Sequence, residues 1–462
     1  MKLLIRNGMI VTPDQVCKKD ILIIGDKIRE VNDNILPREI FHGCKIIDAS
    51  GKFVIPGIID AHTHYFMKSS SNQITADDFY SGSISAAFGG VTTFIDYAEQ
   101  QRGHTIKEAF ANRQKEAKGK AVVDYSLHQS VCSLYPNLKK DLEELKTEGV
   151  NSLKLFTTYK EDGSMLDKES WLDLLRMSRD LKLLITVHAE DDEMIDQNKT
   201  KYKEKGELPP YFHTQLRPPE IEYEAIKKVG NMAKSLDMPI YIVHLSSEKG
   251  YKALKEIRKS RGKIFAETAP HYLLLTEDLL KGKDAQKYFM TPPLRKKEDN
   301  LALWRAIENN DIEVIASDHC SYTIEQKLSS SNCLNILSGI PGSETLLPLV
   351  YSYGVRRGYF DIKRMVNLLS TNPAKIFGLY PEKGSLKVGT DADLVIFDPE
   401  KEIIISDSMQ HTAAGYTPFD GFKVKGYPIA TILRGKVIVN ENRFYGEQGG
   451  GKFLKGKESV LY

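Results

Sequence analysis

The sequence predicts a β/α barrel of the TIM type together with a smaller β-sandwich domain that both chain ends build discontinuously. The chain has 462 residues, which suits a barrel of about 250 residues plus a second unit. Through the middle of the chain, β-branched runs alternate with helix-like segments, as expected for a parallel sheet. Both ends contain only short β-like runs. We therefore predict that residues 53–384 form the barrel and that residues 1–52 and 385–462 form the sandwich.

The first fifty residues read as short strands bounded by turn signals such as Gly25-Asp26 and Ser50-Gly51. The predicted strands are Met1–Ile5, Met9–Val11, Asp20–Ile24, Ile28–Val31 and Lys45–Asp48. A segment this short cannot bury a sizeable core by itself, so we expect it to pack against the other chain end.

Eight apolar, β-branched runs follow, and each is short enough for a buried strand. They are Phe53–Ile59, Val91–Tyr97, Ala121–Ser126, Ser152–Phe156, Leu183–Val187, Ile240–Val243, Ile264–Ala266 and Val314–Ala316. Between them lie segments with helical spacing of apolar residues: Asp77–Phe88, Ile106–Ala117, Leu138–Glu148, Lys168–Asp180, Pro219–Leu236, Lys249–Lys259 and Asn300–Asn309. Eight such strands are the number that closes a TIM barrel.

The C-terminal segment returns to β-branched runs between glycines. Its predicted strands are Asp393–Phe397, Phe422–Val424, Ile429–Leu433 and Lys436–Val439. The tail from Glu441 contains three consecutive glycines at 449–451. We expect this tail to be extended or mobile, or to be an arm that grips a neighbouring subunit.

Composition and charge exclude several classes of protein. Hydrophobic residues make up 41% and charged residues 27% of the chain, so a large core is expected rather than disorder. The net charge of +2, from 64 basic and 62 acidic residues, gives no reason to expect a nucleic-acid partner. No apolar run reaches the roughly 18 residues of a membrane span. The five cysteines are dispersed and odd in number, which indicates reduced thiols and a cytoplasmic protein.

Six residues with metal-binding potential lie at or near the carboxyl ends of predicted barrel strands. They are His62, His64, Lys154, His188, His244 and Asp318. The functional groups of a β/α barrel converge at that face. Because side chains alternate along an extended chain, His62 and His64 point to the same side.

Each of these residues has an ordinary explanation when taken alone. An interior histidine is usually just hydrogen-bonded, Asp318 could cap the next segment, and Lys154 could be a snorkelling strand lysine. The coincidence of all six at one face favours a metal site. Imidazole and carboxylate ligands suit zinc, with manganese, cobalt or iron as alternatives. Two dications would repel an ammonium group, so Lys154 is a ligand only if altered, for example to an anionic carbamate.

At these residues the chain resembles the cyclic amidohydrolases of the dihydropyrimidinase/hydantoinase family. The matching segments cover the six candidate ligands and also a later stretch that resembles the family's return into its small β domain. These segments are 57–64, 152–160, 186–190, 243–247, 291–295, 316–320 and 384–394.

The resemblance implies a centre of two divalent metal ions, most simply Zn²⁺, in a homotetramer or homodimer. One ion would be held by His62, His64, Asp318 and N6-carboxylated Lys154. The second ion would share that lysine and use His188 and His244.

The resemblance also assigns roles in ring opening. An activated water would attack a ring amide carbonyl, with Tyr159 as hydrogen-bond donor to the developing oxyanion. Asp318 would carry the proton from water to the leaving nitrogen. Thr291 and Ser338 resemble positions whose backbone groups bind the ring edge. Two departures weaken the choice of ring, because the family usually has serine at 291 and asparagine at 338. The stretch 338–344 also resembles dihydroorotases and allantoinases.

Position 66 helps to choose a substrate. Dihydroorotases and some allantoinases resemble a pattern with Arg or Asn there, where the polar side chain grips the substrate, and Arg clamps a carboxylate with two parallel hydrogen bonds. Phe66 cannot do this, so we predict a 5,6-dihydropyrimidine or a 5-substituted hydantoin, opened to an N-carbamoyl amino acid. Phe66 and Phe156 are expected either to line the pocket or to belong to the core.

Three alternatives stay open from the sequence. Allantoin or dihydroorotate could be the substrate instead. A non-catalytic assembly protein of the same fold would lack metal ligands, whereas every ligand position is filled here. A mononuclear deaminase of the same superfamily would leave Lys154 without a role.

Overall fold

Eight parallel strands form the central sheet, and they lie side by side in the order in which they occur along the chain. They are β8 (Ile58–Thr63), β9 (Val91–Ala98), β10 (Asp124–Ser130), β11 (Ser152–Phe156), β12 (Leu184–His188), β13 (Ile240–Ile242), β14 (Ile264–Thr268) and β15 (Val314–Ile315). The computed structural model describes residues 2–35, 43–69, 71–202, 206 and 208–462. Met1, the first residue of the first predicted strand, lies outside the described residues.

The two end strands of this sheet meet, which closes it into a barrel. Thr63 at the end of β8 forms a parallel bridge with His319, which follows β15. The backbone N–H and the hydroxyl of Ser317 both donate to the buried Asp60 carboxylate, at 2.9 and 2.6 Å. The predicted barrel is therefore confirmed.

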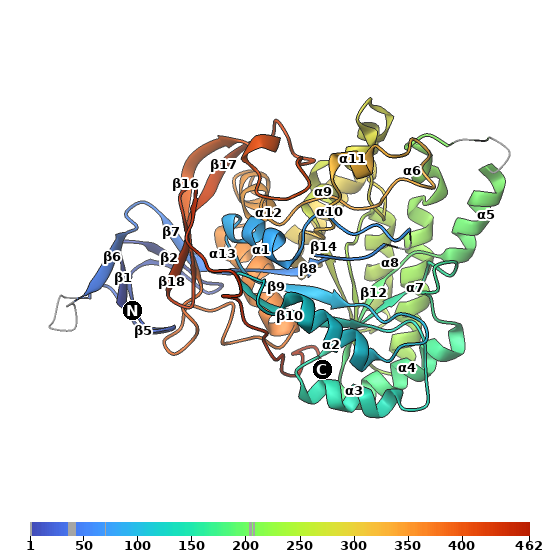
Figure 1. Ribbon diagram of the computed structural model, residues 1–462, viewed down its shortest axis with the longest axis horizontal. Coiled ribbons are helices and arrows are strands. Elements are labelled where there is room, and N and C mark those ends of the chain that lie inside the picture. The colour runs from blue at the N-terminus through green and yellow to red at the C-terminus, as the bar shows by residue number, and fades with distance from the viewer. Residues whose placement is uncertain (1, 36–42, 70, 203–205, 207) are drawn as a thin grey trace.

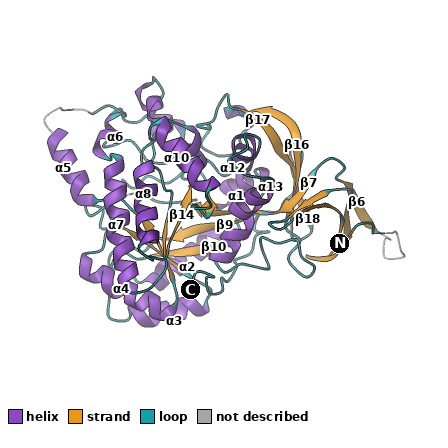
Figure 2. Ribbon diagram, turned by 180° about the vertical axis from the view of Figure 1, so that it is seen from behind, coloured by secondary structure: helices purple, strands orange, loops and turns teal. Residues whose placement is uncertain are grey.

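Helices surround the barrel strands (Figures 1 and 2). The main ones are α1 (Phe79–Phe88), α2 (Ile106–Ala117), α3 (Leu138–Thr147), α4 (Lys168–Leu181), α7 (Pro219–Ser235), α8 (Glu248–Lys259) and α10 (Lys297–Glu308). Shorter helices extend the barrel mouth or follow the last strand: α5 (Asp192–Tyr202), α6 (Phe212–Leu216), α9 (Pro270–Leu274), α11 (Ile324–Lys327), α12 (Leu346–Val350), α13 (Ile362–Val366) and α14 (Asn372–Ile376).

Helix α4 shows why the sequence folds in this way. Asp167 caps its N-terminus by accepting from two backbone N–H groups. Trp171, Leu174 and Leu175 are spaced to share one face, and all three are buried. The helix ends where Lys182 takes a left-handed conformation with φ of 52°.

Two further sheets lie beside the barrel and join both ends of the chain (Figure 1). The first contains β5 (Lys27–Asn32), β4 (Asp20–Ile24), β1 (Lys2–Arg6) and β6 (Cys44–Asp48). The second contains β19 (Arg443–Phe444), β18 (Lys436–Asn440), β17 (Lys423–Leu433), β16 (Leu394–Ile404), β7 (Phe53–Pro56), β2 (Met9–Val11) and β3 (Val16–Lys18). Strand β7 pairs with β2 in parallel and with β16 antiparallel. A shared apolar core includes Ile5, Val54 and Ile432, as predicted for a sandwich built from both ends. The residue limits given above for the domains stay predictions.

Several predicted strand ranges were wrong. The two strands predicted at 422–424 and 429–433 are one continuous strand, β17, and the strand predicted at 393–397 extends to Ile404 as β16. The run 53–59 is split at Gly57 into β7, which belongs to the small domain, and β8, which begins the barrel. A Cβ at Gly57 would lie 2.0 Å from the Thr92 hydroxyl, so only glycine allows this close approach. The third barrel strand covers 124–130 rather than 121–126.

The C-terminal tail is extended and packs against its own barrel. Tyr125 on β10 donates its N–H to Lys452 and accepts from the N–H of Leu454, at 2.9 and 2.7 Å. The last residue, Tyr462, donates its hydroxyl to the carbonyl of Leu183. Within the described ranges, no helix combines the length and apolar character that crossing a membrane requires.

Candidate metal centre and substrate site

His62, His64 and Asp318 form one tight group at the barrel mouth. The two Nε2 atoms of the histidines lie 3.1 Å apart. The Asp318 Oδ1 lies 3.2 Å from Nε2 of His62 and 3.6 Å from Nε2 of His64. Three ligand atoms this close, one from each residue, could bind a single ion.

His188 and His244 form a second pair, reached from β12 and from the residue two positions beyond β13. The Nδ1 of His188 lies 2.9 Å from the Nε2 of His244. The rings of His244 and His62 have centroids 5.6 Å apart, so the pair adjoins the first group. His244 and Asp318 both have positive φ, 39° and 51°. Such conformations are strained for these residues and are typical of functional sites.

Lys154 lies in the middle of β11, is only 2% exposed and reaches the same region. Its Nζ lies 5.0 Å from the centre of the Tyr97 ring, and that ring also contacts the rings of His62 and His64. Burial lowers the pKa of Lys154 to about 8, while Asp318 acts in the opposite direction.

Two buried glutamates orient the candidate ligands, and sequence analysis did not identify either of them. Glu267 on β14 lies 2.5 Å from the Nδ1 of His62, which leaves the Nε2 of that ring facing the site. Glu190 lies 2.7 Å from the Nε2 of His188, which leaves the Nδ1 facing the site. Carboxylates commonly fix metal-binding histidines in this way. Only the spacing of Glu190 two residues after His188 could have suggested one of them.

These side chains fit a pair of divalent cations. Burial holds the pKa values of His62 and His244 well below the usual range, so both imidazoles are neutral and have a lone pair to offer. The donor set of imidazoles, a carboxylate and a modifiable lysine suits two transition-metal ions.

Tyr159 lies on the loop after β11, beside this group. Its ring centroid is 5.2 Å from that of His188, and the Arg217 guanidinium lies 5.4 Å from the ring centre. Burial raises the pKa of the Tyr159 phenol, so the hydroxyl keeps its proton and can donate it in a hydrogen bond. Its φ of 65° is a further left-handed conformation in the site.

Thr291 and Ser338, predicted to bind the ring edge, lie next to each other. Their hydroxyl oxygens are 2.9 Å apart, and the His213 Nε2 lies 3.2 Å from that of Thr291. The Thr291 side chain also interacts with the Tyr159 hydroxyl. The structure therefore brings Tyr159, Thr291 and Ser338 together, although they come from three segments that are far apart in sequence.

The two phenylalanines differ in position. Phe156 ends β11, and its ring lies 5.8 Å from that of Tyr159 and 5.9 Å from that of His188. Phe66 instead lines a cavity of about 180 Å³ that also contains Tyr97 and Glu99. Because Tyr97 contacts His62, this cavity borders the candidate centre.

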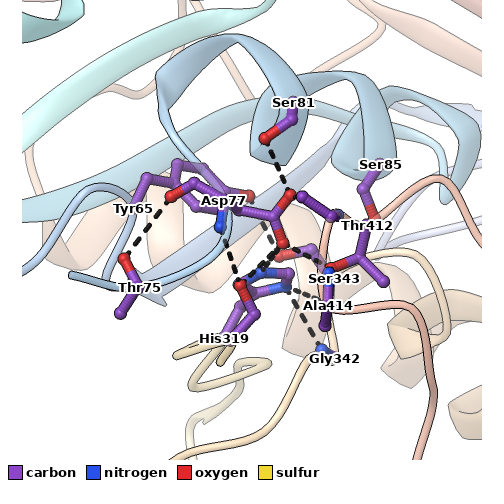
Figure 3. A network of polar contacts seen from close by, with 12 residues as sticks. Tyr65, Thr75, Asp77, Ser81, Ser85, His319, Gly342, Ser343, Thr412 and Ala414 are labelled. Atoms are coloured by element: carbon purple, nitrogen blue, oxygen red, sulfur yellow. Dashed lines mark hydrogen bonds and ion pairs between the residues drawn. The ribbon is translucent and has the colours of Figure 1, made fainter. Parts of the chain in front are cut away.

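A network of polar contacts behind Asp318 holds its loop in place (Figure 3). The Nε2 of the neighbouring His319 lies 3.0 Å from the buried Asp77 carboxylate, which also accepts from Ser321 and Thr412. The His319 Nδ1 accepts from the backbone N–H groups of Gly342 and Ser343. The network joins four chain segments and was not predicted, because Asp77 has no local sequence signal.

A parallel β/α barrel with such a donor set at the carboxyl ends of its strands defines a metal-dependent barrel hydrolase. The sequence profile of the amidohydrolase family matches residues 53–438, and the chain belongs to this family. Membership implies a binuclear metal centre.

Particular relatives narrow this class. The chain is 38% identical to a D-hydantoinase of Ralstonia pickettii and to one of Rhizobium radiobacter, over 99% of each chain. Its structure is similar to that of a dihydropyrimidinase from Brevibacillus agri, with a TM-score of 0.96, 34% identity and full coverage of both chains.

Proposed function

We propose that this protein is a cyclic amidohydrolase that opens 5,6-dihydropyrimidines or 5-substituted hydantoins to N-carbamoyl amino acids. The observation that carries the proposal is the convergence of the His62 group and the His188 pair beside Tyr159. The relatives named as hydantoinases and dihydropyrimidinase support the same reaction.

The proposed ligands divide between two ions. His62, His64 and Asp318 would hold one ion, His188 and His244 the other, and carboxylated Lys154 both. When bound, the ions would polarise the ring carbonyl and make a water nucleophilic near neutral pH.

The protein's own groups would then manage charge and protons. The Tyr159 hydroxyl would donate a hydrogen bond to the carbonyl oxygen as negative charge develops on it. Asp318 would accept the proton of the attacking water and pass it to the ring nitrogen as the C–N bond breaks. Backbone groups at Thr291 and Ser338 would fix the ring edge, and Phe156 would contact its substituent.

The choice of ring rests on Phe66. Its apolar side chain cannot clamp a carboxylate as an arginine at position 66 would, although Lys68, Gln101 and Arg113 also line the cavity that it borders. The decisive experiment gives purified, metal-loaded protein dihydrouracil, a 5-substituted hydantoin, allantoin and dihydroorotate. We expect rapid opening of one of the first two, and much faster opening of allantoin or dihydroorotate would contradict the assignment.

Further parts of the proposal concern the cofactor and the assembly. We propose Zn²⁺ as the metal, N6-carboxylation of Lys154, a cytoplasmic location and a homotetramer or homodimer. All five cysteines are free thiols, which agrees with a reducing compartment. Elemental analysis would identify the metal, ¹³C NMR after exchange with ¹³CO₂ would detect the carbamate, and light scattering would give the oligomer.

A further inference from the structure

Lys327 at the end of α11 is a fully buried lysine with three backbone partners. It is 0% exposed. Its Nζ donates to the carbonyl oxygens of Phe289 and Leu337, both at 2.6 Å, and of Gly339 at 3.0 Å. An ammonium group has three N–H donors, so these bonds use all of them.

This arrangement is costly and therefore calls for a reason. Burial lowers the pKa of Lys327 to about 7, which shows how unfavourable the interior is for its charge. With all donors used on carbonyls, no donor is left for a carboxylate that would neutralise the group. A neutral amine has only two N–H groups, so the three carbonyl contacts favour the ammonium form.

The three carbonyls belong to the two segments that present the predicted ring-binding residues. Leu337 and Gly339 flank Ser338, and Phe289 lies two residues before Thr291. The Gly339 N–H also donates to the Phe289 carbonyl at 3.0 Å, so the segments touch directly. Holding the carbonyls on both sides of Ser338 restricts the direction of the peptide groups between them.

Gly339 packs so closely against the backbone of Cys320 that segment 337–339 has little room to move. Its φ is 142°, and a Cβ at this position would lie 2.3 Å from the Cys320 carbonyl oxygen. Residues 337–339 therefore pass tightly between Lys327 and the Asp318–Cys320 loop.

We propose that Lys327 is a positioning residue that holds segments 289–291 and 337–339 in the geometry needed to bind the edge of the substrate ring. This inference rests on the proposed function. Lys327 would affect the affinity for the ring through the two segments that it bonds to, and not through direct contact with the ring. The His213 ring bonds to the Met290 carbonyl in one segment and the Cys320 thiol to the Ser338 carbonyl in the other, whereas Lys327 bonds to both segments at once.

The first test separates binding from turnover. Lys327→Met keeps an unbranched side chain that fills most of the same space and removes all three donors. We expect KM for the preferred ring to rise by about tenfold or more, because displaced backbone groups would lose one or two hydrogen bonds to the ring, while kcat changes little. The matched control is Lys383→Met, another buried lysine in an ion-pair cluster away from the mouth. It should lower stability without changing KM.

Chemical rescue tests the ammonium itself. Lys327→Ala leaves a space into which n-propylammonium fits, and this cation should restore a low KM, whereas the neutral 1-propanol should not. Neither additive should rescue Lys327→Met, where the space is filled. An unchanged KM in both variants, or a fall in kcat together with lost metal, would overturn the inference.

Amide hydrogen exchange measures how firmly residues 337–341 are held and needs no substrate, so it tests the positioning role independently of the proposed function. In Lys327→Met, and not in Lys383→Met, amide exchange should quicken within residues 337–341, whatever the substrate is. If the parent protein opens none of the rings while this change is seen, the proposed function fails and the positioning role stands. If the parent is active and exchange stays the same, the positioning role fails.

Discussion

In the described part of the chain, two groups of three side chains have ligand atoms close enough to share a metal ion. The two groups differ in whether a protein cation lies among the three side chains. One is His62, His64 and Asp318 at the barrel mouth. The other is Asp124, Asp391 and Asp393, where β10 meets the small domain. In the second group the Nζ of Lys383 lies among the carboxylates, 2.6 Å from Asp124 and 3.0 Å from Asp391, and also contacts Asp393.

The buried lysine explains the difference between the two groups. Lys383 supplies the positive charge that the three carboxylates need, and Arg434 adds a further contact to Asp124. At the barrel mouth, Lys154 lies instead over the rings of Tyr97 and Phe156. The neutral imidazoles of His62 and His244 offer lone pairs there. Ligand-type residues thus indicate a metal site only where the structure leaves the centre of the group open to a cation.

The largest effect is expected from Lys154→Ala. If this lysine bridges two ions, its loss removes metal and slows ring opening by about 10⁴-fold or more, since several kcal/mol of charge stabilisation disappear. Metal content, measured by elemental analysis, and turnover should fall together, and short carboxylic acids should restore part of both. A variant with full metal content and normal turnover would remove Lys154 from the site.

Lys383→Met should act on stability instead. It leaves buried carboxylates without their main cation, so unfolding should become easier by about 3–5 kcal/mol. Denaturant titration would measure this loss. Metal content should equal that of the parent protein, and a drop in bound metal would mean that the acidic cluster is a metal site after all.

Tyr159→Phe separates the residues that hold ions from those that act on the substrate. We expect both ions to remain and turnover to fall by about 10²–10³-fold, because an oxyanion donor is lost. Steady-state kinetics with parallel metal analysis would check this. Retained full activity would assign the ring a packing role against His188.

The smallest effect is expected from Glu267→Gln. The amide keeps the shape of the side chain but is a weaker acceptor for His62 than a carboxyl group, so metal affinity should fall by about 10–100-fold. Competition with a chelator would measure the affinity. Glu313→Gln, at a half-buried glutamate paired with Arg258 outside the site, serves as the control and should leave metal affinity unchanged.

Local patterns predicted much of the fold. The strand and helix alternation located the eight barrel strands and most helices, because apolar spacing follows directly from which face is buried. The boundary at Gly57 was missed, since nothing local distinguishes a strand that changes sheets from one that continues. The interpretation of the tail also stayed open, because its partners on β10 are more than 300 residues away.

For the site, the sequence by itself determined which residues have ligand chemistry and that they lie in or just after barrel strands, because residue type and strand register are local properties. Only the tertiary structure decided which nitrogens of His62 and His188 face the centre, through Glu267 and Glu190. It also decided that Lys383 fills one acidic group and that Lys327 joins two loops. These are contacts between segments distant in sequence, and their energies depend on burial and distance, which no local pattern encodes.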